Sequence, residues 1–124
     1  MRRSEVIIER TFSQEDFDRF ASLSGDDNPI HVDERFSARS RFGRPVAHGL
    51  LLVSVLRGLA DRLAPGSRVV DQSVMFPAPT YADEAMRFRA AITGSGNDDV
   101  TINLEVSRAG DGAVTCQGKC RMAP

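Results

Sequence analysis

The spacing of apolar residues changes close to residue 67 and divides the chain into two kinds of pattern. Before that point, a short strand at 5–11 precedes stretches in which apolar residues recur at helical spacing. Beyond it, apolar and polar residues alternate, which is typical of strands that bury one face. The pattern therefore predicts helices followed by a run of antiparallel strands.

The first predicted helix has clear start and stop signals. Ser13 is suited to cap the free N–H groups at its beginning, and the side chain of Asp16, three residues later, can accept a hydrogen bond from the N–H of Ser13. Gly25 ends the helix, because glycine readily takes the left-handed conformation found there. A second, short helix is expected after Asp33.

The longest helix is expected at 47–63. Between Leu50 and Leu56 it is apolar on nearly all sides, so we expect it to be buried on most of its surface. Four strands follow, at 68–76, 84–92, 99–107 and 113–121.

This order predicts one α+β domain over residues 1–124. A very apolar helix and several half-buried strands can cover each other if an antiparallel sheet wraps around the helix. The hot-dog fold is one arrangement of this kind.

Charge and length narrow the possible partners. The chain has 124 residues, with 16 basic and 17 acidic side chains, so it has no overall positive field to attract nucleic acid or anionic lipid. The start has no apolar signal segment, and no apolar stretch is long enough to span a membrane. Cys116 and Cys120 are about 13 Å apart if they lie on one strand, too far for a disulfide. We therefore expect a cytoplasmic protein with two packing cysteines.

Both histidines lie between the two main helices. Asp26 and His31 are five residues apart across Pro29, so a turn at Asn28-Pro29 can bring the two side chains to one point. A carboxylate and an imidazole that share one water can act as an acid–base pair. The alternative is that Asp26 and Asn28 are turn and cap residues and that His31 is an ordinary hydrogen-bonded side chain.

His48 and Gly49 begin the apolar helix, where free backbone N–H groups favour negative charge. Glycine at this point lets a ligand approach the backbone, as an oxyanion hole requires, although it can also simply relieve crowding. The loop before this helix is rich in arginine. These side chains could bind phosphates or lie in solvent; they are Arg35, Arg39, Arg41 and Arg44.

Residues 20–49 read FASLSGDDNPIHVDERFSARSRFGRPVAHG. This stretch resembles the signature of MaoC-like, R-specific enoyl-CoA hydratases, F-A-x-x-S-G-D-x-N-P-I/L-H-x-D followed by F-x-x-P-I/V-x-H-G. The resemblance implies a hot-dog fold and reversible syn addition of water to a trans-2-enoyl thioester, giving an R-3-hydroxyacyl thioester. No separate cofactor is implied, because coenzyme A is part of the substrate.

The resemblance also implies roles for the matching residues. Asp26 is the expected base and His31 the expected proton donor, Asn28 supports their geometry, and the Gly49 N–H binds the thioester carbonyl. We expect a homodimer, with the substrate tunnel near the subunit boundary. The expected substrate-binding residues are His48, Arg39, Arg41, Arg44 and Phe76.

Two features depart from the family pattern. Phe76 and Pro79 fit an F-x-x-P motif, but Ala82-Asp83 stands where a Gly-Asp turn is common. Arg57 lies on the apolar helix, where we expect it at a subunit interface or in the acyl pocket.

The residues alone are also compatible with two other functions. A hot-dog thioesterase usually needs a carboxylate on the central helix, and residues 49–56 offer only Ser54. A non-catalytic subunit that binds acyl thioesters is a further alternative. The substrate's carrier can be coenzyme A or an acyl carrier protein.

Overall fold

The computed structural model describes residues 4–124 of the chain. Within these residues, one strand is followed by four helices and then by four strands, an α+β order that the sequence predicts except for the short helix at Pro29–Val32, where a turn was expected. Their bounds are β1 Glu5–Thr11, α1 Gln14–Ser24, α2 Pro29–Val32, α3 Glu34–Ala38, α4 Gly49–Leu63, β2 Arg68–Met75, β3 Ala85–Ser95, β4 Val100–Arg108 and β5 Val114–Ala123.

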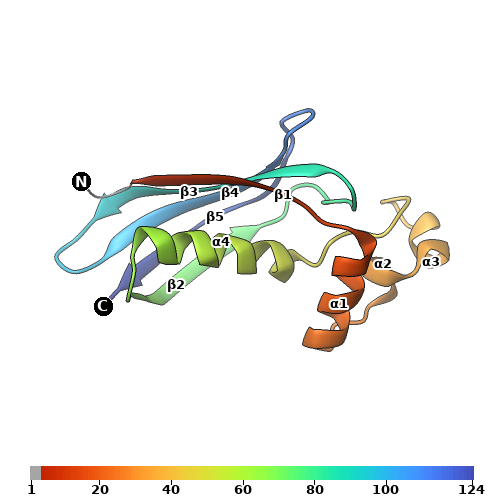
Figure 1. Ribbon diagram of the computed structural model, residues 1–124, viewed down its shortest axis with the longest axis horizontal. Helices are drawn as coiled ribbons and strands as arrows, with labels where there is room; N and C mark the ends of the chain where they lie inside the picture. The colour runs from red at the N-terminus through yellow and green to blue at the C-terminus, as the bar shows by residue number, and fades with distance from the viewer. Residues whose placement is uncertain (1–3) are drawn as a thin grey trace.

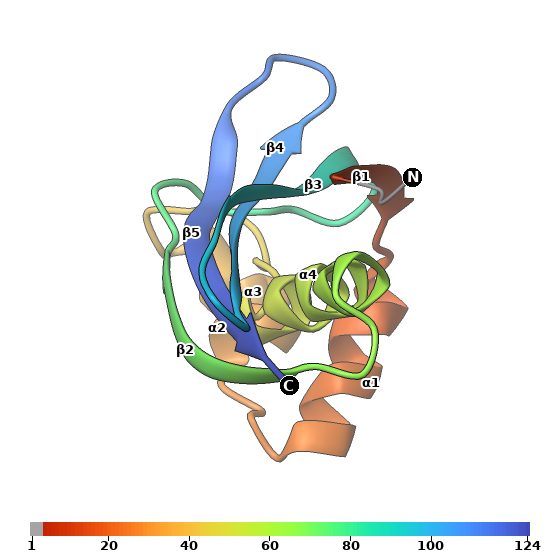
Figure 2. The same cartoon turned by 90° about the vertical axis from the view of Figure 1, so that its left-hand side faces the viewer.

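The five strands form one antiparallel sheet in the order β1-β3-β4-β5-β2. The sheet curls around α4, which is seen nearly end-on inside the curve in Figure 2. The three helices α1, α2 and α3 gather at one end of α4, the end at which it begins (Figure 1). The predicted hot-dog arrangement, a sheet wrapped around a central helix, is confirmed.

Helix α1 begins and ends as its sequence predicts. Asp16 N donates to Ser13 Oγ, and Ser13 N donates to the Asp16 carboxylate, so the two residues cap the helix reciprocally. Gly25 follows in the left-handed conformation with φ 82°. These local contacts fix the point at which the chain leaves α1.

Helix α4 differs from its prediction in two ways. It begins at Gly49 rather than at residue 47, because the backbone of His48 is extended, with ψ 134°, and the Ala47 N–H donates to the Thr80 carbonyl. The expectation that α4 is buried on most sides is wrong for a single chain, since Leu50 is 67% exposed. The sheet covers only one side of α4. The residues on that side are Leu52, Leu56, Leu59, Ala60 and Leu63.

The alternation expected along β5 is broken once. Val106 pairs with Cys116 and Ser107 pairs with Val114, so Thr115 is an extra residue in the ladder. Such a bulge changes the direction of a side chain, and Thr115 is consequently buried together with its neighbour Cys116. Strict alternation would have placed Thr115 on the solvent face.

The cysteines are packing residues, as predicted. Cys116 and Cys120 are buried free thiols in the core under the sheet. Burial raises the pKa of Cys116 to about 11 and also raises the pKa of Cys120. Both side chains are therefore protonated at neutral pH and chemically inert.

Arg57 lies at the edge of the core. Its guanidinium group donates to Met122 Sδ and pairs with Asp61 at 3.2 Å, and 37% of the side chain is exposed. Its predicted place at a subunit interface or in the acyl pocket stays a prediction. Over residues 4–124, no helix has the length and apolar character needed to cross a membrane.

Gly118 of β5 lies close against the backbone of β2. A Cβ added there would lie 2.0 Å from the carbonyl oxygen of Ser73 and 2.8 Å from the Cα of Val74 on β2. Both are backbone atoms that cannot move alone. We expect Gly118→Ala to lower the free energy of unfolding by at least ~2 kcal/mol, measured by urea denaturation. Gly110→Ala, where no described atom lies within 4 Å of the added Cβ, is the matched control. Equal stability of the two variants would contradict this interpretation of Gly118.

Candidate active site

A short turn brings Asp26 and His31 to the same side of the molecule. Helix α1 ends before Asp26, and Pro29 begins α2, so the two residues lie on separate elements, as predicted. Asn28 Oδ1 accepts a hydrogen bond from Ile30 N at 3.0 Å and caps α2. Asn28 thereby holds the first turn of the helix that carries His31.

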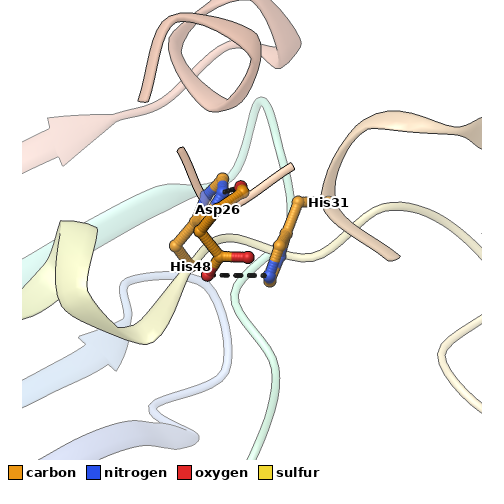
Figure 3. Close-up of side chains that lie close together, drawn as sticks. All are labelled: Asp26, His31 and His48. Carbon is orange, nitrogen blue, oxygen red and sulfur yellow. Dashed lines mark hydrogen bonds and ion pairs between the residues drawn. The ribbon is translucent and has the colours of Figure 1, made fainter. Parts of the chain in front are cut away.

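The two side chains approach each other closely without touching. His31 Nε2 lies 3.9 Å from Asp26 Oδ2. A dashed line joins the two groups in Figure 3. This distance is too long for a direct hydrogen bond but lets one water contact both groups. The other ring nitrogen, Nδ1, lies 2.8 Å from the Val46 carbonyl oxygen, to which it must donate. Nε2 is therefore the ring nitrogen that is free to exchange a proton on the side of Asp26.

His48 contacts both members of this pair. It is 2% exposed, and its Nε2 donates to the Asp26 carbonyl oxygen at 2.9 Å. Its ring stacks on His31, with centroids 3.8 Å apart, and also contacts Phe20. A side chain so buried fixes the positions of both neighbours. Its predicted direct contact with substrate stays a prediction.

Burial lowers the pKa of His48 below its ordinary value of 6.5, and the neighbouring His31 acts in the same direction. An unfolded chain therefore binds a proton at His48 at a higher pH than the folded chain does. The free energy of unfolding should consequently fall as the pH drops below 6.5.

We expect His48→Gln, which keeps a hydrogen-bond donor but does not titrate, to weaken this pH dependence. Urea denaturation at several values between pH 5 and pH 8 measures it. If the free energy of unfolding of the variant depended on pH as it does in the wild type, His48 would not be the cause of the lost stability at low pH.

The first N–H of α4 lies next to this cluster in the chain. Gly49 is the first helical residue, so its N–H has no acceptor inside the helix. The ring of Phe76 rests against Gly49, and a Cβ added to Gly49 would lie 2.6 Å from the tip of that ring. A side chain at Gly49 would therefore displace the ring of Phe76, which is 46% exposed.

A pocket of about 750 Å³ opens beside Gly49. Gly49 and Leu52 of α4 form one wall, the segment from Phe76 to Tyr81 forms another, and Thr115 of β5 contributes a third. Arg41, Phe42 and Arg108 also line it. The volume is in the range of small-molecule sites.

The three arginines predicted to bind substrate lie in different surroundings in the structure. Arg41 lines the pocket, whereas Arg44 lies over the Tyr81 ring and 3.5 Å from Glu84 Oε2. Arg39 follows α3 as an exposed residue and is not among the pocket residues in the described chain. Sequence reasoning missed Arg108, because its place at the end of a strand gave no motif.

Asp26, His31 and His48 can be considered as metal ligands, since one donor atom from each lies within 4.8 Å of the others. Their arrangement does not fit this use well. One nitrogen of each imidazole donates to a backbone carbonyl, which leaves the other nitrogen free. However, the stacked rings direct these free lone pairs along nearly parallel planes, whereas metal ligands must converge on one point. The geometry favours a shared water over an ion.

Comparison with known proteins identifies the family. The model of the MaoC like domain matches residues 2–114, which is most of the chain. The chain belongs to the MaoC-like domain family. The predicted family resemblance is confirmed.

Several relatives of this MaoC-like chain have named activities. An (R)-specific enoyl-CoA hydratase of Aeromonas caviae is 33% identical over 93 residues, covering 73% of this chain and 69% of the relative. A 3-hydroxybutyryl-CoA dehydratase of Methylorubrum extorquens is 34% identical over 115 residues, covering 80% of this chain and 73% of the relative. Among solved structures, the (R)-hydratase of A. caviae involved in PHA biosynthesis matches with a TM-score of 0.88 at 29% identity, covering 96% of this chain and 92% of that one.

Proposed function

We propose that this MaoC-like protein is a hydratase and dehydratase of acyl thioesters. More specifically, it adds water reversibly to trans-2-enoyl thioesters and forms R-3-hydroxyacyl thioesters. The observation that carries the proposal is the 3.9 Å separation of the Asp26 carboxylate and His31 Nε2 beside the helix start at Gly49. The names of the two relatives with hydratase and dehydratase activity support it.

In the hydration direction, the Asp26 carboxylate accepts a proton from water while the water oxygen bonds to the β-carbon. The carbon–carbon π electrons move toward the thioester carbonyl, and the Gly49 N–H stabilises the negative charge on that oxygen. Protonated His31 then donates from Nε2 to the α-carbon, as its Nδ1–H stays bonded to Val46. Proton transfer from Asp26 back to His31 restores both groups, so the net change is the addition of one water.

The relative positions of the two side chains support syn stereochemistry. Asp26 and His31 face the same small space, and Figure 3 shows the Asp26 carboxylate directed at the His31 ring edge. Oxygen and hydrogen supplied from this space reach the same face of the double bond. His48 and Asn28 are positioning residues in this scheme, since each holds the backbone or helix that carries a reacting group.

Crotonyl-CoA tests the proposal directly. We expect loss of the enoyl absorbance without thiol release, and we expect an R-specific dehydrogenase to oxidise the product. Release of free thiol from a saturated acyl-CoA would instead show a thioesterase. Coenzyme A binding without turnover of any enoyl chain length would show a non-catalytic binding subunit. A series of enoyl esters of increasing length, on coenzyme A and on an acyl carrier protein, defines the preferred substrate.

We also propose that the protein is a homodimer. The side of α4 that the sheet leaves open carries Leu50, and the neighbouring segment exposes Met75 and Phe76. A second copy of the chain can cover these apolar side chains, which a small domain otherwise leaves in water. Light scattering should give twice the 13.6 kDa mass of the chain. A mass of one chain at micromolar concentration would overturn this proposal.

A further inference from the structure

The carbonyl group of Val46 fixes the orientation of the His31 ring. Its oxygen lies 2.8 Å from His31 Nδ1 and accepts a hydrogen bond from that atom. The N–H of Val46 donates to the carbonyl oxygen of Ile30, the residue before His31, at 3.1 Å. Because the hydrogen bond at one ring nitrogen determines where the proton of the ring lies, the position of Val46 leaves Nε2 free beside Asp26.

Val46 belongs to the loop between α3 and α4, and this loop is attached to the segment before β3. Val46 and Tyr81 form an isolated antiparallel bridge. The N–H of Ala47 donates to the carbonyl oxygen of Thr80 at 2.8 Å. The backbone that carries the acceptor of His31 is therefore paired with the backbone at Thr80 and Tyr81.

The side chain of Tyr81 contacts the same loop at two further residues. Its hydroxyl donates to the carbonyl oxygen of Phe42 at 2.8 Å. The guanidinium group of Arg44 lies over its ring, 4.1 Å from the centroid, which is a favourable cation–π contact. Tyr81 thus contacts the loop at Phe42, Arg44 and Val46, which are every second residue of the stretch that leads to α4.

Charged groups hold Tyr81 itself in place. Glu84 pairs with Arg44 at 3.5 Å and with Arg108 at 3.6 Å, so one carboxylate joins two arginines. Both guanidinium groups lie over the Tyr81 ring, that of Arg108 at 5.7 Å from the centroid. Arg108 also donates to the carbonyl oxygen of Pro79 at 2.6 Å. The end of β4 therefore fixes the segment on which Tyr81 lies.

We propose that Tyr81 is a positioning residue for His31. It holds the carbonyl of Val46 where His31 Nδ1 donates to it, and so keeps Nε2 directed at the reacting groups. This inference rests on the proposed function, in which His31 donates a proton from Nε2 to the α-carbon. The Tyr81 hydroxyl is bonded to Phe42, so Tyr81 acts through the loop and not on the substrate.

The backbone of His31 is held by other contacts. Gln14 on α1 donates from Nε2 to the carbonyl oxygen of His31 at 2.9 Å, and Asn28 caps α2. Loss of the Tyr81 contacts should therefore release the ring at Nδ1 while α2 stays in place. A released ring can turn and can carry its proton on either nitrogen, so fewer molecules have the arrangement that proton transfer requires.

Steady-state kinetics with crotonyl-CoA test this role. We expect Tyr81→Phe, which loses only the hydroxyl, to lower kcat about threefold, and Tyr81→Ala to lower it about ten- to thirtyfold, both with unchanged KM. Phe36→Ala, which removes a half-exposed ring from α3, is the matched control and should keep both constants. A raised KM at unchanged kcat would overturn the inference, because it would place Tyr81 in contact with the substrate.

The tautomers of the two histidines give a second measurement that does not depend on activity. The hydrogen bonds place the proton on Nδ1 in His31 and on Nε2 in His48, and the nitrogen-15 chemical shifts of a neutral imidazole report this difference. At pH 8, Tyr81→Ala should move the two His31 signals toward each other and leave the His48 signals in place. Tyr81→Phe should show a smaller movement, and it serves alone if melting curves show that the Ala variant is unfolded. Unmoved His31 signals, or an equal movement of the His48 signals, would overturn the inference.

A double-mutant cycle determines whether Tyr81 acts through His31. Adding Tyr81→Ala to His31→Ala should cause no further loss of turnover, because the ring that Tyr81 orients is already absent. A further loss as large as that in the wild type would refute the assignment of Tyr81. A wild-type protein that hydrates no enoyl thioester would refute the hydratase proposal instead, and the nitrogen-15 measurement would still test how Tyr81 affects His31.

Discussion

His31→Ala and Asp26→Asn are each expected to reduce turnover of crotonyl-CoA by about 10²- to 10⁴-fold, the usual contribution of a positioned acid or base. The Asn variant keeps the shape of the side chain and the backbone carbonyl that His48 binds, but it cannot accept a proton from water. The Ala variant removes the imidazole ring that donates to the Val46 carbonyl and faces Asp26, so it has no proton donor at this position. Loss of enoyl absorbance under saturating substrate measures both.

Asp27→Asn is the matched control for the first variant. Asp27 is the next residue in the chain and is exposed, so the change removes the same charge at the same turn without touching the candidate pair. We expect near wild-type turnover. If Asp27→Asn lowered activity as much as Asp26→Asn, the general charge of the turn would explain the loss and the assigned role of Asp26 would be wrong.

Gly49→Ala should have the second largest effect, with turnover reduced by about 10²-fold. The new Cβ would lie 2.6 to 2.9 Å from three atoms of the Phe76 ring, so ring and helix start must separate. A displacement near 1 Å at a group that binds a reacting carbonyl can cost about 10²-fold in rate. Steady-state kinetics with crotonyl-CoA, together with a melting curve, distinguish a lost carbonyl contact from an unfolded chain.

Two further variants make this prediction specific. Gly58→Ala lies on the same helix, where an added Cβ meets no described atom within 4 Å, and it should raise the free energy of unfolding by about 0.5–1 kcal/mol at unchanged turnover. Adding Phe76→Ala to Gly49→Ala removes the clash and should recover part of the lost activity. A double variant no more active than Gly49→Ala would show that the clash with Phe76 is not the cause.

The local signals of the chain predicted those elements whose stability depends on neighbouring residues. The capping contacts of Ser13 and Asp16, the left-handed Gly25 and the turn at Pro29 all involve residues a few positions apart. Asp26 and His31 are also near each other in the chain, whereas Gly49, 18 positions after His31, was assigned to the same site only through the family motif.

Features that depend on distant residues were not predictable. The N–H of Ala47 donates to the carbonyl of Thr80, 33 residues away, in the extended segment that precedes α4. The bulge at Thr115 depends on how β5 pairs with β4, and the residue types near this position do not indicate it.

The hydrogen bonds of the two imidazoles attach the acid–base pair to the segment directly before α4. His31 is bound to the carbonyl of Val46, and His48 is bound to the carbonyl of Asp26, so the acid–base pair is attached to the segment of residues 46–48. Gly49 follows directly. The length of this four-residue segment therefore sets the spacing between the proton-transfer groups and the carbonyl donor. The part of the arginine-rich loop that precedes Phe42 can change in length without altering that spacing.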